Sequence, residues 1–304
     1  MSDKTLLIIA GPTAIGKTAL AVQLAQYFNT AVLSADARQC YKEMQIGTAK
    51  PSIEEQQGIP HYFIDSHPLS EALSVADYEQ YAISVLEQLF LEKDIVVVCG
   101  GTGLYINALC DGLDTMPPVD SEIEEAVNQL YASGGMAALQ FALQEEDSLF
   151  VQNGAMQNPH RMLRALAFKR SVGESILLYQ THTQKERPFK CVKIALEMPR
   201  AILYDRINHR VDNMVAEGLL DEVKSLLSYR EHKNFQTVGY QEWLPFFDHT
   251  ASIEACIDKI KQHTRNYAKR QMTWFKNKGN FIHLSALDND LLQQVLLEIK
   301  KANA

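Results

Sequence analysis

The sequence predicts an α/β fold in which a parallel sheet is flanked by helices, with a helical insertion domain. Two observations predict this class. In the first third of the chain, short apolar strand patterns alternate with helical patterns, as in sheets covered by helices on both faces. From about Met116 the strand patterns stop, and residues 121–187 are strongly helical with a polar break at Gln152-Asn153-Gly154. We therefore expect a core of residues 1–115 and 188–304, and an insertion of residues 116–187.

The elements of the core are expected in a simple order along the chain. The candidate strands are Thr5–Ala10, Ala31–Ser34, His61–Asp65, Ile95–Cys99, Cys191–Glu197 and Phe281–Ser285. The candidate helices are Thr18–Phe28, Val75–Leu91, a segment from Arg200 to a break at Gly218, Ile253–Lys276 and Asp290–Lys301. In such sheets the ligand site lies at the carboxyl ends of the strands.

A phosphate-binding loop follows the first strand. The run Gly11-Pro12-Thr13-Ala14-Ile15-Gly16-Lys17-Thr18 fits the pattern G-x-x-x-x-G-K-[ST]. A buried strand precedes it and a helix follows it, so backbone N–H groups and a helix N-terminus would surround a phosphate group. Lys17 supplies a positive charge and the Thr18 hydroxyl can bind Mg²⁺. The sheet is therefore expected to be P-loop NTPase-like, with a bound di- or triphosphate.

Composition excludes several classes of protein. The 304-residue chain carries a net charge of −8, which argues against a protein that coats nucleic acid through bulk charge. The five cysteines are scattered without a C-x-x-C pair, which disfavours a zinc site or a disulfide framework and fits a reducing cytoplasm. No apolar stretch is long enough to span a membrane, and no obligate protein partner is evident.

Polar residues follow the second and fourth strands. Asp36 lies just beyond the second strand, where a carboxylate could hold Mg²⁺ through water or accept a proton, although it could equally be a helix cap. Gly100-Gly101-Thr102-Gly103 follows the fourth strand, where nucleotide-hydrolysing P-loop enzymes usually place an aspartate. That departure disfavours a motor ATPase, and no Asn-Lys-x-Asp or D-x-x-G element supports a GTPase. The glycines allow something to approach the backbone closely, or they form only a tight turn.

Three helical segments carry basic residues. Arg161 and Arg164 share one face of a helix that begins near Pro159, and Arg210 follows Arg206 by one turn on another helix. Near the C-terminus a basic stripe interleaves with Tyr267, Trp274 and Phe275, which suggests a polyanion-binding surface, the alternative being a solvated helix face. We define the basic stripe as Lys259, Lys261, Arg265, Lys269, Arg270, Lys276 and Lys278.

Taken together, these segments resemble the tRNA dimethylallyltransferase (isopentenyl-diphosphate:tRNA transferase) family over nearly the whole chain. The matching stretches, in order, are GPTAIGKT at 11–18, SADARQCYK at 34–42, GTAKPS at 47–52, PHYFID at 60–65, GGTGLY at 100–105, NPHRMLRAL at 158–166, LYDRINHRVDNMVAEGLLDEV at 203–223, QTVGYQE at 236–242 and TRNYAKRQMTWFK at 264–276. The chain departs from the family at Ala37, where serine is usual, after Leu166, and at Gln241, where a basic residue is usual.

The resemblance implies an enzyme that transfers a dimethylallyl group from dimethylallyl diphosphate to N6 of the adenosine 3′ to the anticodon, position 37 of tRNA. It implies that the loop from Gly11 to Thr18 holds the diphosphate with Mg²⁺ on Thr18. Catalytic roles would fall to Asp36 as base, Lys17, Thr102 and Arg210. The anticodon stem-loop would be met by Asp36, Ala37, Arg38, Gln39, Thr102, His160, Arg161, Met162, Leu163, Arg164, Gln236, Thr237, Val238, Gly239, Tyr240, Gln241, Lys269 and Arg270.

Two other functions stay open at the level of sequence. A nucleoside or small-molecule kinase would place ATP in the loop and use Asp36 to bind the phosphoryl acceptor. A phosphate-sensing RNA-binding module would use the same loop and the basic stripe without turnover. Product formation from unmodified tRNA and dimethylallyl diphosphate separates these functions.

Overall fold

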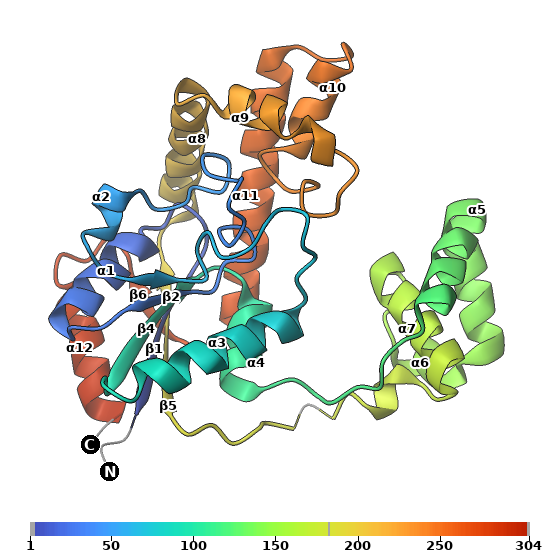
Figure 1. Cartoon of the computed structure of the whole chain (residues 1–304), viewed down its shortest axis with the longest axis horizontal. Coiled ribbons are helices and arrows are strands. Elements are labelled where there is room, and N and C mark those ends of the chain that lie inside the picture. The colour runs from blue at the N-terminus through green and yellow to red at the C-terminus, as the bar shows by residue number, and fades with distance from the viewer. Residues whose placement is uncertain (1–3, 182, 303–304) are drawn as a thin grey trace. The chain divides into compact units, whose positions relative to one another are not determined.

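The centre of the computed structural model, which describes residues 4–181 and 183–302, is a six-stranded parallel sheet (Figure 1). All paired strands run parallel, in the order β3-β2-β4-β1-β5-β6. The strands are β1 (Thr5–Ala10), β2 (Val32–Ser34), β3 (His61–Tyr62), β4 (Ile95–Gly100), β5 (Lys190–Glu197) and β6 (Ile282–Ser285). The predicted fold class is confirmed.

Strand β1 is one of the two central strands of the sheet, and every one of its residues is buried. Its register places Ile8 beside Val98 of β4 and Lys193 of β5. Alternate side chains enter two separate cores, with Leu6 and Ile8 on one face and Leu7 and Ile9 on the other. A continuous apolar run of this kind is what a strand covered on both faces requires.

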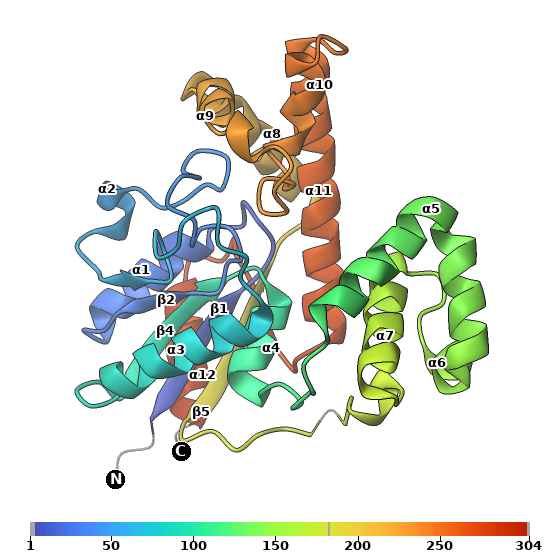
Figure 2. The same ribbon diagram turned by 45° about the vertical axis from the view of Figure 1, so that its right-hand side comes forward.

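Helices cover the two faces of the sheet. On one face, α3 (Val75–Leu89) and α4 (Gly103–Asp111) pack on the core that contains Leu6 and Ile8. On the other face lie α1 (Lys17–Tyr27) and α12 (Leu291–Ala302). Figures 1 and 2 show these helices around the sheet. The layered arrangement leaves the carboxyl ends of the strands available for a site.

A group of helices gathers near one end of this layered core (Figure 2). Its long members are α8 (Arg200–Ala216) and α11 (Ile253–Asn277), which pack on each other. The shorter members are α9 (Leu219–Ser225), η2 (Leu227–Tyr229), η3 (Gln241–Trp243) and α10 (Leu244–Phe247), while α2 (Ile53–Gln56) follows β2 in the chain. The fully buried Trp243 and Tyr240 anchor the loop between α9 and α11 in the core.

The chain divides into two compact units, one holding the chain up to Cys110 and from Glu186 onward, the other holding Asp111–Lys185. The second unit contains α5 (Ser121–Glu146), α6 (Ser148–Asn153), α7 (Pro159–Val172) and η1 (Ile176–Leu178) around its own apolar core. Helix α5 is kinked at Gly135, whose φ of 60° and ψ of −153° are not helical. The expectation of helix as far as residue 187 was too long, because the described residues between Leu178 and Lys190 form no helix.

Strand β3 is much shorter than the sequence predicts, whereas β2 and β6 each begin one residue later than expected. The expected strand His61–Asp65 ends at Tyr62. Phe63 and Asp65 have φ values of 59° and 50°, and this left-handed backbone cannot continue an extended strand. The chain therefore turns away from the sheet edge after two paired residues. Among the described residues, no helix is long and apolar enough to cross a membrane.

Candidate active site

A cavity of about 580 Å³ lies at the carboxyl ends of β1, β2 and β4. The loop after each of these strands contributes to its wall, and α8, α11 and the 236–241 loop complete it. It brings together most of the residues that the sequence predicts for the site. These are Thr13, Ala14, Ile15, Gly16, Lys17, Thr18, Asp36, Ala37, Arg38, Gln39, Thr102, Arg210, Gln236, Thr237, Val238, Gly239, Gln241 and Arg270.

The phosphate-binding loop depends on two glycines. Gly11 has φ 146°, and a Cβ there would meet the carbonyl oxygen of Leu196 at 3.0 Å. Gly16 has φ 103° and is the N-cap of α1, so the helix begins at Lys17. Gly11 and Pro12 are buried and lie outside the cavity wall, where they shape the loop. The loop therefore presents its backbone and the start of α1 to the cavity, as anion binding requires.

Two cationic side chains face this loop. The Lys17 ammonium donates to the carbonyl oxygen of Pro12 at 2.8 Å, and Nη1 of Arg210 donates to the Thr13 hydroxyl at 3.3 Å. Burial lowers the pKa of Lys17 to about 8, against the opposing effect of the nearby Asp36 carboxylate. Burial also lowers the pKa of Arg210. Among the described residues, neither cation has a carboxylate partner at hydrogen-bonding distance, and such desolvated positive charges suit a polyanionic ligand.

Asp36 is held by its own turn. Its Oδ1 accepts the backbone N–H groups of Arg38 at 2.9 Å and Gln39 at 3.3 Å, an arrangement that fixes the carboxylate while Oδ2 remains for a ligand. The Thr102 hydroxyl oxygen accepts the N–H of Ala37 at 3.1 Å. Thr102 thus ties the tip of β4 to the loop that carries Asp36, so both functional side chains are positioned by one contact.

The glycines at the end of β4 and in the turn after it are required because other parts of the chain approach their Cα atoms too closely for a side chain to fit. A Cβ on Gly100 would lie 2.2 Å from the carbonyl oxygen of Ala35, and one on Gly103 would lie 2.4 Å from the Trp274 ring. A Cβ on Gly101 would lie 2.2 Å from Nε2 of Gln271. The turn therefore has no room for side chains because the residue that follows β2 and two side chains of α11 pack directly against it.

Gln271 is a site residue that the sequence analysis missed. It lies on α11, is 6% exposed, and accepts the N–H of Thr13 at 2.9 Å while donating to the carbonyl oxygen of Gly101 at 2.9 Å. It joins the phosphate-binding loop to the tip of β4. In the sequence, Gln271 differs from its neighbours only as an uncharged polar residue within the basic stripe. Its role could not be predicted from this, because its two partners are distant in the chain.

The 236–241 loop closes one side of the cavity. The Arg38 Nε donates to the Thr237 hydroxyl at 3.0 Å, and the Gly239 N–H donates to the buried Glu242 at 2.8 Å. Tyr240 differs from the prediction of an RNA contact, because it is 0% exposed and donates to Glu222 at 2.7 Å. Its side chain supports the loop from inside.

Only part of the basic stripe is available to a ligand. Lys261 pairs with Asp212 at 2.5 Å and Arg265 donates to Asn208 at 2.6 Å, so these two side chains hold α11 on α8. The exposed Lys269 and Arg270 line a second, shallow hollow of about 550 Å³. The other residues of that hollow are Asn266, Thr273, Trp274, Asn277 and Lys278.

The predicted contacts of the insertion lie on α7 in the second unit. Asn158 caps this helix by accepting the Arg161 N–H at 3.1 Å, and Pro159 follows in the first turn. His160, Arg161 and Arg164 are exposed, and Leu163 is half-buried. Met162 is 0% exposed in the unit's own core, so the structure corrects the expectation that its side chain meets RNA.

The cavity offers donors that fit Mg²⁺ bound together with a diphosphate. The Thr18 hydroxyl and the carboxylates of Asp36 and Glu55 line it. No cluster of three or more His, Cys, Asp or Glu residues that could bind a metal occurs among the described residues. Mg²⁺ is commonly held by one or two protein oxygens, water and substrate phosphates, so this sparse set suits a substrate-bound ion.

Comparisons with known proteins agree with this geometry. The IPP transferase family model matches residues 39–278. The chain is 45% identical to a tRNA dimethylallyltransferase of Cytophaga hutchinsonii over 90% of both chains. It is similar to the crystal structure of a tRNA isopentenylpyrophosphate transferase from Bacillus halodurans, with 36% identity, a TM-score of 0.72, and coverage of 98% of this chain and 96% of the other.

A further solved structure is of a eukaryotic dimethylallyltransferase acting on tRNA. It has 28% identity to this chain and a TM-score of 0.77, and the match covers 98% of this chain and 77% of the other. The matches to these two solved structures cover 98% of this chain, and the family model covers it from Gln39 through α11. The chain therefore belongs to the IPP transferase family of tRNA dimethylallyltransferases.

Proposed function

We propose that this protein transfers the dimethylallyl group of dimethylallyl diphosphate to N6 of the adenosine at position 37 of tRNA. The observation that carries the proposal is the joint placement of a phosphate-binding loop and the Asp36 carboxylate in one cavity. A group-transfer enzyme needs its leaving-group site and its proton acceptor within reach of the same reacting atoms. Family membership identifies the group and the acceptor.

The phosphate-binding loop takes the leaving group. When the allylic carbon–oxygen bond breaks, its electron pair passes to the diphosphate, and negative charge grows there. The start of α1, Lys17 and Arg210 line the cavity. In this proposal their N–H groups and positive charges stabilise the charge as it develops. The half-buried setting strengthens each of these interactions because little water screens them.

Asp36 activates the acceptor amine and takes its proton. The adenine amine is a weak nucleophile, and a carboxylate oxygen that accepts a hydrogen bond from it raises its reactivity. As the new nitrogen–carbon bond forms, the amine proton passes to Asp36, whose other oxygen stays fixed by the N–H groups of Arg38 and Gln39. The base reaches the cavity only after it leaves its stack in the anticodon loop.

Mg²⁺ fits this scheme as a companion of the substrate. Thr18 would hold it beside the diphosphate, with Asp36 or Glu55 reaching it through water. When bound, the ion neutralises charge on the diphosphate oxygens.

The surface around the cavity suits an anticodon stem-loop. Arg38, the 236–241 loop and the hollow that contains Lys269 and Arg270 supply polar and positive groups beside the cavity. Within the second unit, taken by itself, the exposed His160, Arg161 and Arg164 form another basic segment on α7. In a chain of net charge −8, such local concentrations of positive charge favour phosphate contacts.

The direct test is incubation of the purified protein with unmodified tRNA, dimethylallyl diphosphate and Mg²⁺, followed by nucleoside analysis. N6-dimethylallyladenosine at position 37 is the expected product. Transfer of phosphate from ATP to a nucleoside, with no prenylated product, would identify a kinase instead. Binding of tRNA and diphosphate without any product would identify a binding module.

A further inference from the structure

Glu222 on α9 accepts four hydrogen bonds. Its Oε2 accepts the N–H groups of Gln45 at 3.0 Å and Ile46 at 2.8 Å, and its Oε1 accepts the N–H of Gly47 at 3.1 Å. The Tyr240 hydroxyl donates to the same Oε1 at 2.7 Å. One side chain therefore fixes three consecutive peptide groups of a loop that is more than 170 positions away in the chain.

The loop fixed by Glu222 forms one wall of the cavity at Gly47, Thr48 and Ala49. It leaves no space between itself and Tyr240, since a Cβ on Gly47 would lie 2.5 Å from the Tyr240 ring. Burial, followed by the Glu222 carboxylate, raises the pKa of Tyr240, so its hydroxyl remains a donor. Glu222 itself does not line the cavity.

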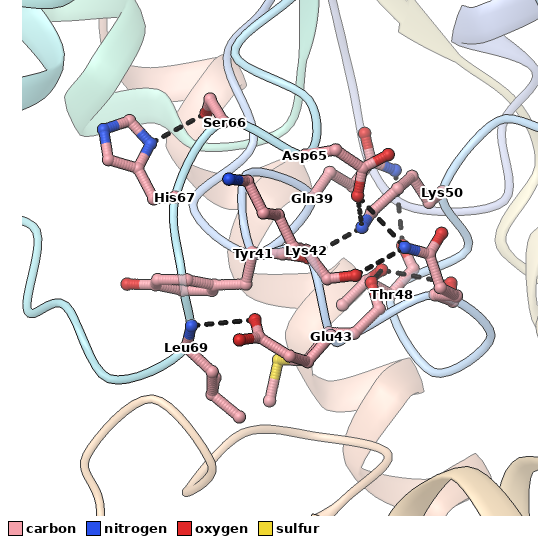
Figure 3. A network of polar contacts seen from close by, with 12 residues as sticks. Gln39, Tyr41, Lys42, Glu43, Thr48, Lys50, Asp65, Ser66, His67 and Leu69 are labelled. Atoms are coloured by element: carbon pink, nitrogen blue, oxygen red, sulfur yellow. Dashed lines mark hydrogen bonds and ion pairs between the residues drawn. The ribbon is translucent and has the colours of Figure 1, made fainter.

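The same loop determines which way the Gln39 amide faces. Nε2 of Gln39 donates to the carbonyl oxygens of Thr48 at 3.3 Å and Ala49 at 3.0 Å, as Figure 3 shows in part. These two hydrogen bonds use both hydrogens of the Gln39 amide. They also fix its orientation, because the flipped amide would place its oxygen against two carbonyl oxygens. Oε1 is the polar atom that remains, and Gln39 lines the cavity beside Asp36. Oε1 of Gln39 and Oδ2 of Asp36 are therefore both available to accept hydrogen bonds from a ligand in the cavity.

A second attachment holds the far end of the loop. Lys50, whose side chain is 3% exposed, donates to the carbonyl oxygen of Tyr41 at 2.7 Å and pairs with Asp65 at 2.5 Å (Figure 3). Gln45 donates to the same carboxylate of Asp65 at 3.0 Å. These contacts are local in sequence. Glu222 is the attachment that joins the loop to a distant helix.

We propose that Glu222 is a positioning residue for the acceptor half of the active site. By fixing residues 45–49 it keeps the Gln39 amide oriented with its oxygen available, and thereby favours a base that presents an amine. The inference rests on the proposed function, since it concerns how that function selects its acceptor. Among the described residues, none of the four hydrogen bonds of Glu222 reaches the phosphate-binding loop, so the donor half is expected to be independent of it.

The chemistry of the four contacts makes Glu222→Gln a sharp probe. All four partners are donors, and a glutamine has one acceptor oxygen where the carboxylate has two. Whichever way its amide turns, its NH₂ group takes the place of an oxygen that accepts two of the four hydrogen bonds. The isosteric change therefore removes half of the acceptor contacts and sets the NH₂ against at least one backbone N–H. Asp221→Asn is the matched control, because Asp221 is the preceding, exposed acid of the same helix.

The experiment measures KM for tRNA and for dimethylallyl diphosphate separately in the full-length variants. For Glu222→Gln we expect KM for tRNA to rise by about tenfold or more while KM for the diphosphate changes less than about twofold. Glu222→Asp, which keeps two acceptor oxygens, is expected to recover part of the loss. Asp221→Asn is expected to match the wild type.

A second readout reports on selection of the acceptor. An anticodon stem-loop with inosine at position 37 presents an oxygen in place of the amine, and its Kd is compared with that of the adenosine version. The ratio of the two Kd values is expected to fall by about threefold or more in Glu222→Gln. A loss of stability alone would not change this ratio.

Several results would overturn the inference. These are equal increases in both KM values, an unchanged Kd ratio, or wild-type kinetics in the folded fraction of Glu222→Gln. If that variant does not fold, Tyr240→Phe removes one of the four donors and is expected to shift the same two readouts in the same direction, and no shift would overturn the inference. Failure of the wild type to prenylate tRNA would instead count against the proposed function.

Discussion

The backbone N–H of Thr13 donates to Oε1 of Gln271 at 2.9 Å, although the two residues are 258 positions apart. The other end of the same amide donates to Gly101, next to Thr102. A single buried side chain therefore spans the leaving-group loop and the strand end that positions Asp36. The relative placement of the two halves of the active site depends on α11 as well as on the sheet.

Replacement of Gln271 should impair the donor half of the site. Gln271→Leu loses both contacts, and Gln271→Glu keeps an acceptor for Thr13 but adds negative charge beside the diphosphate. Both variants are expected to lower kcat/KM for dimethylallyl diphosphate by about 10- to 100-fold in steady-state assays. Gln262→Leu, an exposed glutamine of the same helix, is the control. A wild-type value for Gln271→Leu would show that the bridge is not needed.

Asp36→Asn should slow the chemical step selectively. The amide oxygen can still accept the N–H groups of Arg38 and Gln39, so the turn is preserved, but the proton acceptor is lost. We expect the single-turnover rate to fall by about 10²- to 10⁴-fold, with the Kd for tRNA within a few-fold of wild type. An unchanged single-turnover rate would refute the assignment of Asp36 as base.

The affinity for the donor should depend on pH through Lys17. Because its pKa is lowered to about 8, the free enzyme carries this positive charge at pH 7 and loses it as the pH rises through 8. KM for dimethylallyl diphosphate is therefore expected to rise above about pH 8, approaching tenfold per pH unit. In Lys17→Arg the rise should disappear because arginine stays charged. A flat profile in the wild type between pH 7 and about 9.5 would contradict this.

Lys269 and Arg270 should contribute phosphate contacts. Their joint replacement by alanine is expected to weaken tRNA binding and to reduce the slope of log K against log salt by about one to two. Binding is measured by a salt titration with inactive or donor-free enzyme. The double replacement of Lys300 and Lys301, which removes the same charge from the exposed end of α12, is the control. Equal slopes in wild type and the Lys269/Arg270 variant would exclude this contact.

Gly103→Ala should destabilise the fold. The added Cβ would lie 2.4 Å from the Trp274 ring, and either the start of α4 or the ring must move. The free energy of unfolding is expected to fall by about 1–3 kcal/mol in urea titrations. Combining it with Trp274→Leu should recover part of the loss, and strictly additive effects would exclude a direct clash.

Much of this molecule could be predicted from local sequence. Strand β1 matches its predicted bounds because an uninterrupted apolar run followed by a glycine-rich phosphate loop is specific. The loop from Thr13 to Thr18 and the residues that follow β2 converge in one cavity because they follow parallel strands of one sheet. Periodicity and strand-end position carry this information.

The remainder depended on partners that are distant in the chain. Nothing local marks Gln271 or Glu222 as a bridge, and nothing local distinguishes Lys261, which pairs with Asp212, from the exposed Lys269. The positive φ of Phe63 shortened β3, although its sequence suits a strand. The burial of Met162 and Tyr240 likewise arises from tertiary packing.

The helical insertion leaves and rejoins the core at neighbouring points. The Lys185 N–H donates to the carbonyl oxygen of Asp111 at 2.8 Å, so the excursion begins and ends at the same place. Its length can consequently vary during evolution without shifting the strands on either side. A chimaera that carries a different helical module between these two points is expected to retain the catalytic scaffold.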